Sequence, residues 1–498
     1  MTTTAKTKKG KNADIYSQLK QAIGADKIKV DELALATYAF DVSPRPFARP
    51  GMVVLPENKE DVVQTLLLAN AYKIPVTILS SGITGRGLTL PSEGGIVLDF
   101  RRMNRVLEIN TDSGYAWIEP GTNFDKFSGE LAKKGFRCHL GTAPGGAATL
   151  GNYLLRSSGS LGNRHLDSIV DLEVVLPDGT VLNTGSSHFP GVGAHMRYGP
   201  YPDLTGLYCC AYGTLGVITR AAIRIYPVNE ATRVAVAQFD TFASAVDFMK
   251  DIINHNIPEH AIIWNWQLYR TFEISNPDQP LAEFPRSLTG DPAKAPEDSP
   301  YALVTSFLSG YKETLDANEK VMARVARKYG GKALTQAQAE KLAPGSMKGW
   351  EQLFIKYRPV VPLALFGLGK YMPWIVCTEP RQVKELERWA VAEIDKQGAR
   401  PVCYYSQPFD FGRSIFFRIF VFPEHDKPEV AEKVQQTYAR MYREAMKKYG
   451  AHPYRHNPGQ SFVFETGGYY TLLKKIKDAV DPNNILSPQV GLFKEEDL

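Results

Sequence analysis

The chain has 498 residues, of which 44% are apolar and 22% are charged, and its formal net charge is +5. These values are typical of a globular protein of two or three domains and disfavour a disordered chain or a nucleic-acid-binding protein. No apolar run approaches the roughly 18 residues of a membrane span. The first residues lack the apolar core of a secretory signal, and five cysteines without paired spacing predict no disulfide framework. We therefore expect a cytoplasmic protein that binds no nucleic acid and has no membrane span.

The first part of the chain alternates short apolar strands with helices. Helical spacing predicts a helix over 15–28, in which Ile28 is the last apolar residue. A strand at 53–56 is followed by an amphipathic helix at 61–71 and an apolar strand at 74–79. This order predicts a β-α-β crossover unit. The residues after 79 then lie at the carboxyl end of a strand, where ligands commonly bind.

Further elements are predicted from apolar alternation, helical periodicity and turn residues. The expected strands are 95–99, 105–109, 115–121, a hairpin over 172–182, 221–226, 301–308 and 414–422. The expected helices are 124–134, 243–254, 315–329, 430–449 and 469–480. Because the pattern of elements changes near residue 231, we place a domain boundary there.

Three loops rich in glycine, serine and threonine occupy residues 80–91, 141–152 and 157–163. Glycine permits positive φ and a close approach of the backbone to a ligand, and successive N–H groups form nests for anions. Each loop alone could be an ordinary turn, but together they favour one long ligand that contains a pyrophosphate. The glycines of the first loop do not match the Gly-x-Gly-x-x-Gly fingerprint, which disfavours a nicotinamide-binding Rossmann domain.

Five motifs resemble, in the same order, those of the vanillyl-alcohol oxidase / p-cresol methylhydroxylase (FAD-binding PCMH-type) flavoprotein family. They are the loop 80–91, the runs 145–152 and 213–219, the hairpin 173–182 and the terminal segment 481–488. The segment 198–207 and the pair Tyr454-Arg455 resemble the phenol-oxidising branch. The resemblance implies an α+β fold. Two α+β subdomains would form an FAD-binding domain from residues 1–230 with 456–498, and residues 231–455 would form an α+β cap that holds the substrate.

The resemblance also implies FAD as the cofactor, with its pyrophosphate on the first loop. The expected contacts in that loop are Ser80, Ser81, Gly82, Ile83, Thr84, Gly85 and Gly87. The other expected contacts are Gly145, Gly146, Thr149, Gly151, Asn152, Gly159, Ser160, Asn163, Gly216, Val217 and Ile218. Related enzymes attach the flavin through a histidine or tyrosine. This chain has Ile83 at one such position and neither type at Arg413-Ser414, although Tyr404 and Tyr405 lie upstream. We therefore predict FAD without a covalent link.

The same resemblance implies that the substrate is held as a phenolate. In the phenol oxidisers a Tyr-Arg pair, here Tyr454-Arg455, and a second tyrosine stabilise the oxyanion, which assists loss of a hydride from the para side chain. This chain has Arg86 in place of the second tyrosine and the uncharged Ala143 where the family has an acidic residue. We expect Arg86 to act as the second anion clamp, and the alternative is that it pairs with the FAD pyrophosphate. The candidate bases, which the sequence does not rank, are His139, His165, His456 and Glu465.

The sequence thus predicts an FAD-dependent oxidase or dehydrogenase of para-substituted phenols, such as lignin-derived aromatics. Two alternatives are a 2-hydroxyacid dehydrogenase of the lactate or glycolate type and a flavin-binding interaction subunit without turnover. The Tyr454-Arg455 pair favours the first function, as does the lack of a Gly-Glu-His-Gly-type metal-binding stretch. No metal site is predicted, because Pro453 interrupts the spacing of His452 and His456. The resemblance is compatible with a cytochrome or another protein as the electron acceptor. It is also compatible with assembly of the chain into a homo-oligomer.

Overall fold

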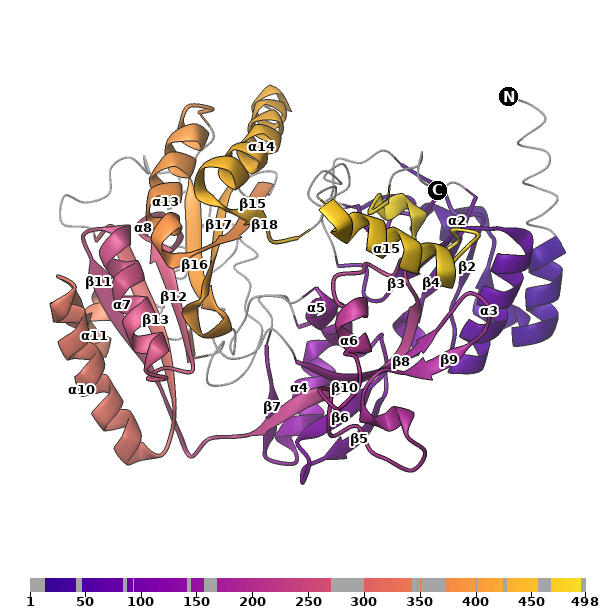
Figure 1. Cartoon of the computed structure of the whole chain (residues 1–498), viewed down its shortest axis with the longest axis horizontal. Helices are drawn as coiled ribbons and strands as arrows, with labels where there is room; N and C mark the ends of the chain where they lie inside the picture. Colours follow the sequence, from indigo (N-terminus) through magenta and orange to yellow (C-terminus); the bar gives the residue numbers. More distant parts are fainter. Residues whose placement is uncertain are drawn as a thin grey trace.

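The computed structural model describes residues 14–41, 47–83, 87–92, 94–140, 145–155, 168–269, 300–342, 347, 350–351, 372–398, 402–423, 428–455 and 467–493. These residues form three sheets with helices packed on them (Figure 1). The first two sheets and the C-terminal helix lie together, and the third sheet lies beside them with its own helices (Figure 1). The arrangement confirms the predicted α+β class.

The first sheet has four strands and contains the predicted crossover unit. In spatial order its strands are β1 (Ile28–Lys29), β2 (Met52–Val54), β4 (Ile96–Asp99) and β3 (Val76–Leu79). β2 and β3 both run parallel to β4, and α3 (Lys59–Tyr72) connects them. Because β3 ends at Leu79, Ser80 begins the first glycine loop at the carboxyl edge of this sheet.

The helix predicted over 15–28 is too long at its C-terminal end. The structure has a helix over 14–23, and Gly24 then adopts a φ of 97°, which a right-handed helix does not continue through. The 3-10 turn η1 (Ala25–Lys27) follows, and Ile28 pairs with Val54 as the first residue of β1. The side chain of Ile28 is buried because it joins the sheet, which local periodicity does not reveal.

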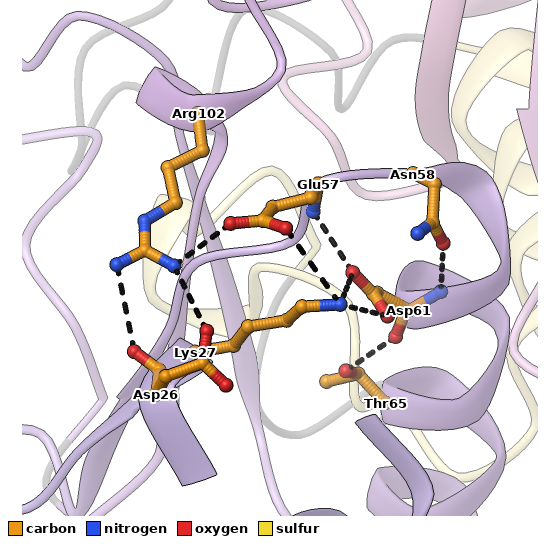
Figure 2. Close-up of polar contacts among 7 residues, drawn as sticks. All are labelled: Asp26, Lys27, Glu57, Asn58, Asp61, Thr65 and Arg102. Carbon is orange, nitrogen blue, oxygen red and sulfur yellow. Dashed lines mark hydrogen bonds and ion pairs between the residues drawn. The ribbon is translucent and has the colours of Figure 1, made fainter. Parts of the chain in front are cut away.

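Charged side chains fix the N-terminus of α3 (Figure 2). Asn58 caps the helix, with its Oδ1 accepting from the backbone N–H of Asp61 at 2.9 Å. The buried Asp61 carboxylate accepts from Lys27 Nζ at 2.8 Å, so η1 is joined to the helix. The 3-10 turn η2 (Phe100–Arg102) follows β4, and its Arg102 side chain donates to Glu57 at 3.0 Å. These contacts join the start of the crossover helix to η1, which precedes β1, and join the segment just before the helix to η2, which follows β4.

The second sheet is antiparallel and follows the first along the chain. Its main path is β5 (Val106–Asn110), β6 (Tyr115–Ile118), β10 (Val217–Pro227), β8 (Ile169–Val175) and β9 (Val181–Asn183), and β7 (Phe136–Cys138) pairs with β10. The short elements around it are α4 (Phe124–Ala132), α5 (Thr149–Leu154), η3 (Ser186–His188) and α6 (Leu204–Tyr208). The short helix α2 (Glu32–Ala36) instead packs on the first sheet, where Leu35 clusters with Val53 and Val97. The predicted hairpin is confirmed as β8 and β9.

The third sheet has eight strands, all antiparallel to their neighbours. Their order is β14 (Lys332–Leu334), β11 (Ala231–Phe239), β13 (Ala302–Gly310), β12 (His260–Asn265), β16 (Cys403–Phe409), β17 (Ser414–Val421), β15 (Met372–Thr378) and β18 (His452–Pro453). Four amphipathic helices pack on one face, namely α7 (Phe242–Asn254), α10 (Lys312–Lys328), α13 (Pro380–Asp395) and α14 (Pro428–Tyr449). Three shorter elements are α8 (Trp266–Tyr269), α11 (Gln336–Leu342) and η8 (Asp410–Gly412).

The C-terminal segment closes on the first two sheets (Figure 1). It consists of α15 (Gly467–Val480), a turn and η10 (Pro488–Val490). Val76 of β3 donates to the Ile485 carbonyl at 2.7 Å and accepts from Ser487 N–H at 2.9 Å. Lys477, which is 1% exposed, pairs with Asp481 at 2.5 Å, and the Asp481 carboxylate also accepts backbone N–H groups from the turn. The Asp-Pro-Asn-Asn motif is therefore a buried, hydrogen-bonded turn that extends the sheet beside β3.

Candidate functional site

Two of the predicted cofactor loops meet at the carboxyl end of β3. Gly151 of α5 lies so close to Ser80 that an added Cβ would be 3.2 Å from the Ser80 Oγ. A Cβ on Gly146 would in the same way be 3.7 Å from the Cδ1 of Ile83, whose side chain is largely exposed. Gly82 has a φ of 72°, a conformation that glycine adopts without steric strain. The structure thus brings the start of the first loop against the second, as a shared ligand requires.

Two polar side chains of α5 support a bound ligand at this junction. Thr149 is completely buried, and its Oγ has no hydrogen-bond partner among the described residues. In the same part of the chain, the buried Oδ1 of Asn152 has no partner either. Because buried polar atoms are normally hydrogen-bonded, these atoms fit a ligand that supplies N–H or O–H donors. FAD carries such groups along its length, so the residues present fit this cofactor.

Some predicted cofactor positions are glycine for reasons that the protein itself supplies. A Cβ on Gly145 would lie 2.1 Å from the Asp125 carboxylate, which belongs to the first turn of α4. A Cβ on Gly216 would lie 2.5 Å from Val174 Cγ1. Val217 is fully buried in the core of the first sheet, and Ile218 pairs with Val174 in the second sheet. A contact of these residues with FAD stays a prediction.

Hydrogen bonds also stabilise both ends of the first glycine loop. The Gly87 N–H donates to Asp41 Oδ2 at 2.9 Å, and Ser81 Oγ lies 3.5 Å from the Ile83 N–H. The remaining predicted residues lie outside the described part of the chain, so their roles stay predictions. They are Thr84, Gly85, Arg86, Ala143, Gly159, Ser160, Asn163, His165, His456 and Glu465.

One face of the eight-stranded sheet, opposite the four helices, is lined by aromatic rings, and we call it the aromatic face. Its rings include those of Trp264, Trp350, Tyr405, Phe409, Phe416, Phe420 and Tyr454. Tyr454 follows β18, and its ring lies 5.0 Å from that of Phe416 and 5.1 Å from that of Phe409. The Arg455 guanidinium lies 5.7 Å from the centre of the Tyr454 ring. The predicted pair Tyr454-Arg455 is therefore placed at the edge of the aromatic face.

Two polar residues in the middle of this face were missed by the sequence reasoning. Arg418 of β17 donates to the Tyr405 hydroxyl at 3.1 Å and lies over the ring of Phe420. Gln407 of β16 is completely buried, and neither of its side-chain polar atoms has a hydrogen-bond partner among the described residues. The available signal was a polar residue at an inward position of an otherwise apolar strand, as in Phe416-Phe417-Arg418-Ile419-Phe420.

A buried ion pair joins the second sheet to the third. Arg137 of β7 donates to Glu259, which precedes β12, at 2.5 Å, and each side chain is only 5% exposed. Ser309 donates to the other carboxylate oxygen at 2.6 Å. Next to this pair, burial lowers the pKa of His260 to about 3, and the nearby His139 adds a smaller electrostatic effect. His260 is therefore neutral at physiological pH.

The described ranges contain neither a metal-binding cluster nor a membrane-spanning helix. No group of three or more His, Cys, Asp or Glu side chains there is placed to hold a metal ion. None of the helices in those ranges has the length and apolar character that a membrane crossing requires. The five cysteines are all free thiols.

Two family profiles match the chain. The profile described as "FAD binding domain" covers residues 50–185, and that described as "FAD linked oxidases, C-terminal domain" covers residues 228–490, more than half of the chain. The chain belongs to the FAD-linked oxidase family. The cofactor of this FAD-linked oxidase is FAD, and its activity is that of an oxidoreductase, as predicted.

Proteins similar to this FAD-linked oxidase include one named for the oxidation of a 2-hydroxy acid and one named for the oxidation of a phenol. Over 95% of this chain and 96% of the other, it is 23% identical to the glycolate oxidase subunit GlcD of Bacillus subtilis. It is 26% identical to the flavoprotein subunit of 4-cresol dehydrogenase (hydroxylating) of Pseudomonas putida, over 94% and 92% of the two chains. The crystal structure of p-cresol methylhydroxylase with substrate bound matches with a TM-score of 0.83 at 23% identity, over 97% and 96% of the chains. This structural similarity confirms the predicted fold.

Proposed function

We propose that this FAD-linked oxidase oxidises para-substituted phenols, with hydride transfer from the para side chain to FAD. The observation that carries the proposal is the position of Tyr454 and Arg455 at the edge of the aromatic face. Aromatic rings favour an aromatic ligand through offset and edge-to-face contacts. The similarity to 4-cresol dehydrogenase over nearly the whole chain supports the same substrate class.

The Tyr454-Arg455 pair would act on the phenol oxygen. The Arg455 Nε is buried and has no hydrogen-bond partner among the described residues, so it is available to an anion. An arginine within about 4–6 Å lowers the pKa of a phenol because it stabilises the ionised form, and the Tyr454 hydroxyl would donate a further hydrogen bond. The negative oxygen releases electron density toward the para position and makes loss of hydride from the attached carbon easier. FAD supplies the hydride acceptor when it is bound.

The remaining roles follow from this assignment. We propose that residues 1–230 with 456–498 hold FAD without a covalent link, and that 231–455 cover it and bind the substrate. Arg86 would be the second clamp on the phenolate. Acid precipitation tests the cofactor link, because non-covalent FAD stays in the supernatant, whereas yellow precipitate would show that the flavin is attached.

Anaerobic reduction of the flavin tests the substrate class. We expect 4-ethylphenol to bleach the flavin absorbance and its O-methyl ether to leave the absorbance unchanged, because methylation prevents formation of the phenolate. Equal rates with both compounds would contradict the phenolate mechanism. A flavin that no organic substrate reduces would favour the non-catalytic alternative.

Oxidation of 2-hydroxy acids is the second candidate function, and Arg418 favours it. Its guanidinium lies within the aromatic face, and guanidinium groups bind carboxylates through paired, charge-assisted hydrogen bonds. The similarity to the glycolate oxidase subunit points the same way. Glycolate and D-lactate in the same anaerobic assay discriminate the two functions. Faster bleaching by either acid than by 4-ethylphenol would favour the second.

A further inference from the structure

Gln407 lies at the centre of the aromatic face. It is directly opposite Phe416 on the neighbouring strand, and alternation along β16 places it on the same face as Tyr405 and Phe409. Phe416 in turn contacts the ring of Tyr454. Since directly opposed Cβ atoms are about 4.5–5.5 Å apart, Gln407 lies about one aromatic ring away from Tyr454, toward the middle of the sheet.

The burial of this amide is unfavourable without a ligand. Gln407 has no exposed surface, and both Oε1 and Nε2 are without a hydrogen-bond partner among the described residues. An amide that loses its water without new partners destabilises the fold, whereas an apolar side chain of similar shape would not. No described residue supplies the missing partners, and we therefore assign them to a bound molecule. Because the amide NH2 group and the amide oxygen are both unpaired, the matching group both accepts and donates, as a hydroxyl does.

We propose that Gln407 binds a hydroxyl on the para side chain of the substrate, so that the enzyme selects 4-hydroxyphenyl alcohols over 4-alkylphenols. This inference rests on the proposed function, because it places the phenol oxygen at Tyr454-Arg455. The ring then lies along the aromatic face, and its para side chain extends toward Gln407. In this arrangement Gln407 is a specificity-determining residue, while the Tyr454-Arg455 pair stabilises the phenolate in either substrate class.

Binding of two unreactive analogues tests the proposal. The compounds 2-(4-hydroxyphenyl)propan-2-ol and 4-tert-butylphenol differ by a hydroxyl in place of a methyl, and neither has a hydrogen on the carbon attached to the ring. We would measure both dissociation constants on the FAD-loaded enzyme from the shift of the flavin absorbance. In Gln407→Met we expect the alcohol to bind about 10- to 100-fold more weakly and 4-tert-butylphenol to bind as tightly as before or more tightly.

The control is Ser406→Ala, which removes a buried hydroxyl from the same strand. Ser406 donates to the Phe416 carbonyl at 2.8 Å and belongs to the opposite face of the sheet, so its loss should not change the ratio of the two dissociation constants. Gln407→Leu provides the same comparison if the methionine variant does not retain FAD.

The outcomes separate this inference from the proposed function. An unchanged ratio in the Gln407 variants would overturn the inference and indicate that Gln407 binds water or has only a structural role. If phenols reduce the wild-type flavin but the enzyme binds the two analogues equally, the inference fails and the proposed function stands. If no phenol reduces or binds the wild-type enzyme, both fail together.

Discussion

The buried ion pair between Arg137 and Glu259 joins the second sheet to the third, and we expect its loss to lower the stability of the protein. Replacing Glu259 by alanine takes a carboxylate away from the buried Arg137 guanidinium and removes the acceptor of the Ser309 hydroxyl. Both charged side chains are only 5% exposed, so water cannot replace the lost partner. Breaking a buried pair from one side costs about 3–5 kcal/mol, and we expect Glu259→Ala to lower the free energy of unfolding by this amount.

Equilibrium urea unfolding, monitored by tryptophan and flavin fluorescence, measures the effect. A surface ion pair provides the control, because Arg233 lies 2.5 Å from Glu319 with 28% and 47% of the side chains exposed, and it also pairs with Asp316 at 2.9 Å. Glu319→Ala should cost less than about 1 kcal/mol. The double variant Arg137→Met with Glu259→Leu removes both charges together, and we expect it to cost less than Glu259→Ala alone. The reasoning is refuted if Glu259→Ala costs no more than Glu319→Ala. It is also refuted if the double variant costs as much free energy of unfolding as Arg137→Met and Glu259→Leu, measured separately, cost together.

Three further predictions concern the site and the third sheet. Arg455→Ala and Tyr454→Phe should retain FAD but slow flavin reduction by 4-ethylphenol by about 10²- to 10³-fold, since each removes a hydrogen bond to the developing oxyanion; a parallel loss of FAD and activity would indicate a structural role. Thr149→Val should weaken FAD binding by roughly fivefold, the equivalent of about 1 kcal/mol, if its hydroxyl binds the cofactor, and an unchanged dissociation constant would exclude that contact. Burial raises the pKa of the Glu387 carboxyl, which accepts from the Tyr301 hydroxyl at 2.7 Å. The folded state therefore holds this proton more tightly than the unfolded state, and the stability that Glu387 contributes is complete below its unfolded pKa of about 4.3 and is lost as the pH rises through the raised value. Glu387→Gln should gain thermal stability relative to the wild type as the pH increases from 4 to 8, and a constant difference across that range would contradict this reasoning.

The sequence by itself determined the local elements and the type of ligand. The periodicity of 61–71 and the apolar run at 74–79 predicted α3 and β3, because amphipathic helices and buried strands are encoded in adjacent residues. The glycine, serine and threonine loops indicated a backbone-held cofactor for the same reason. The Tyr454-Arg455 pair was found only through the family resemblance, since two adjacent residues carry no pattern of their own.

The tertiary structure decided which distant residues meet. Ile28 continues a helical pattern in the sequence, yet it enters a strand because Val54 is there to pair with it. The contact of Val76 with Ile485, and that of Arg137 with Glu259, join positions far apart in the chain, and no local pattern encodes such pairs. Gln407 illustrates the same limit. Its neighbours in sequence do not reveal an unpaired amide, because its burial depends on the strand that lies opposite and on the face of the sheet toward which β16 directs it.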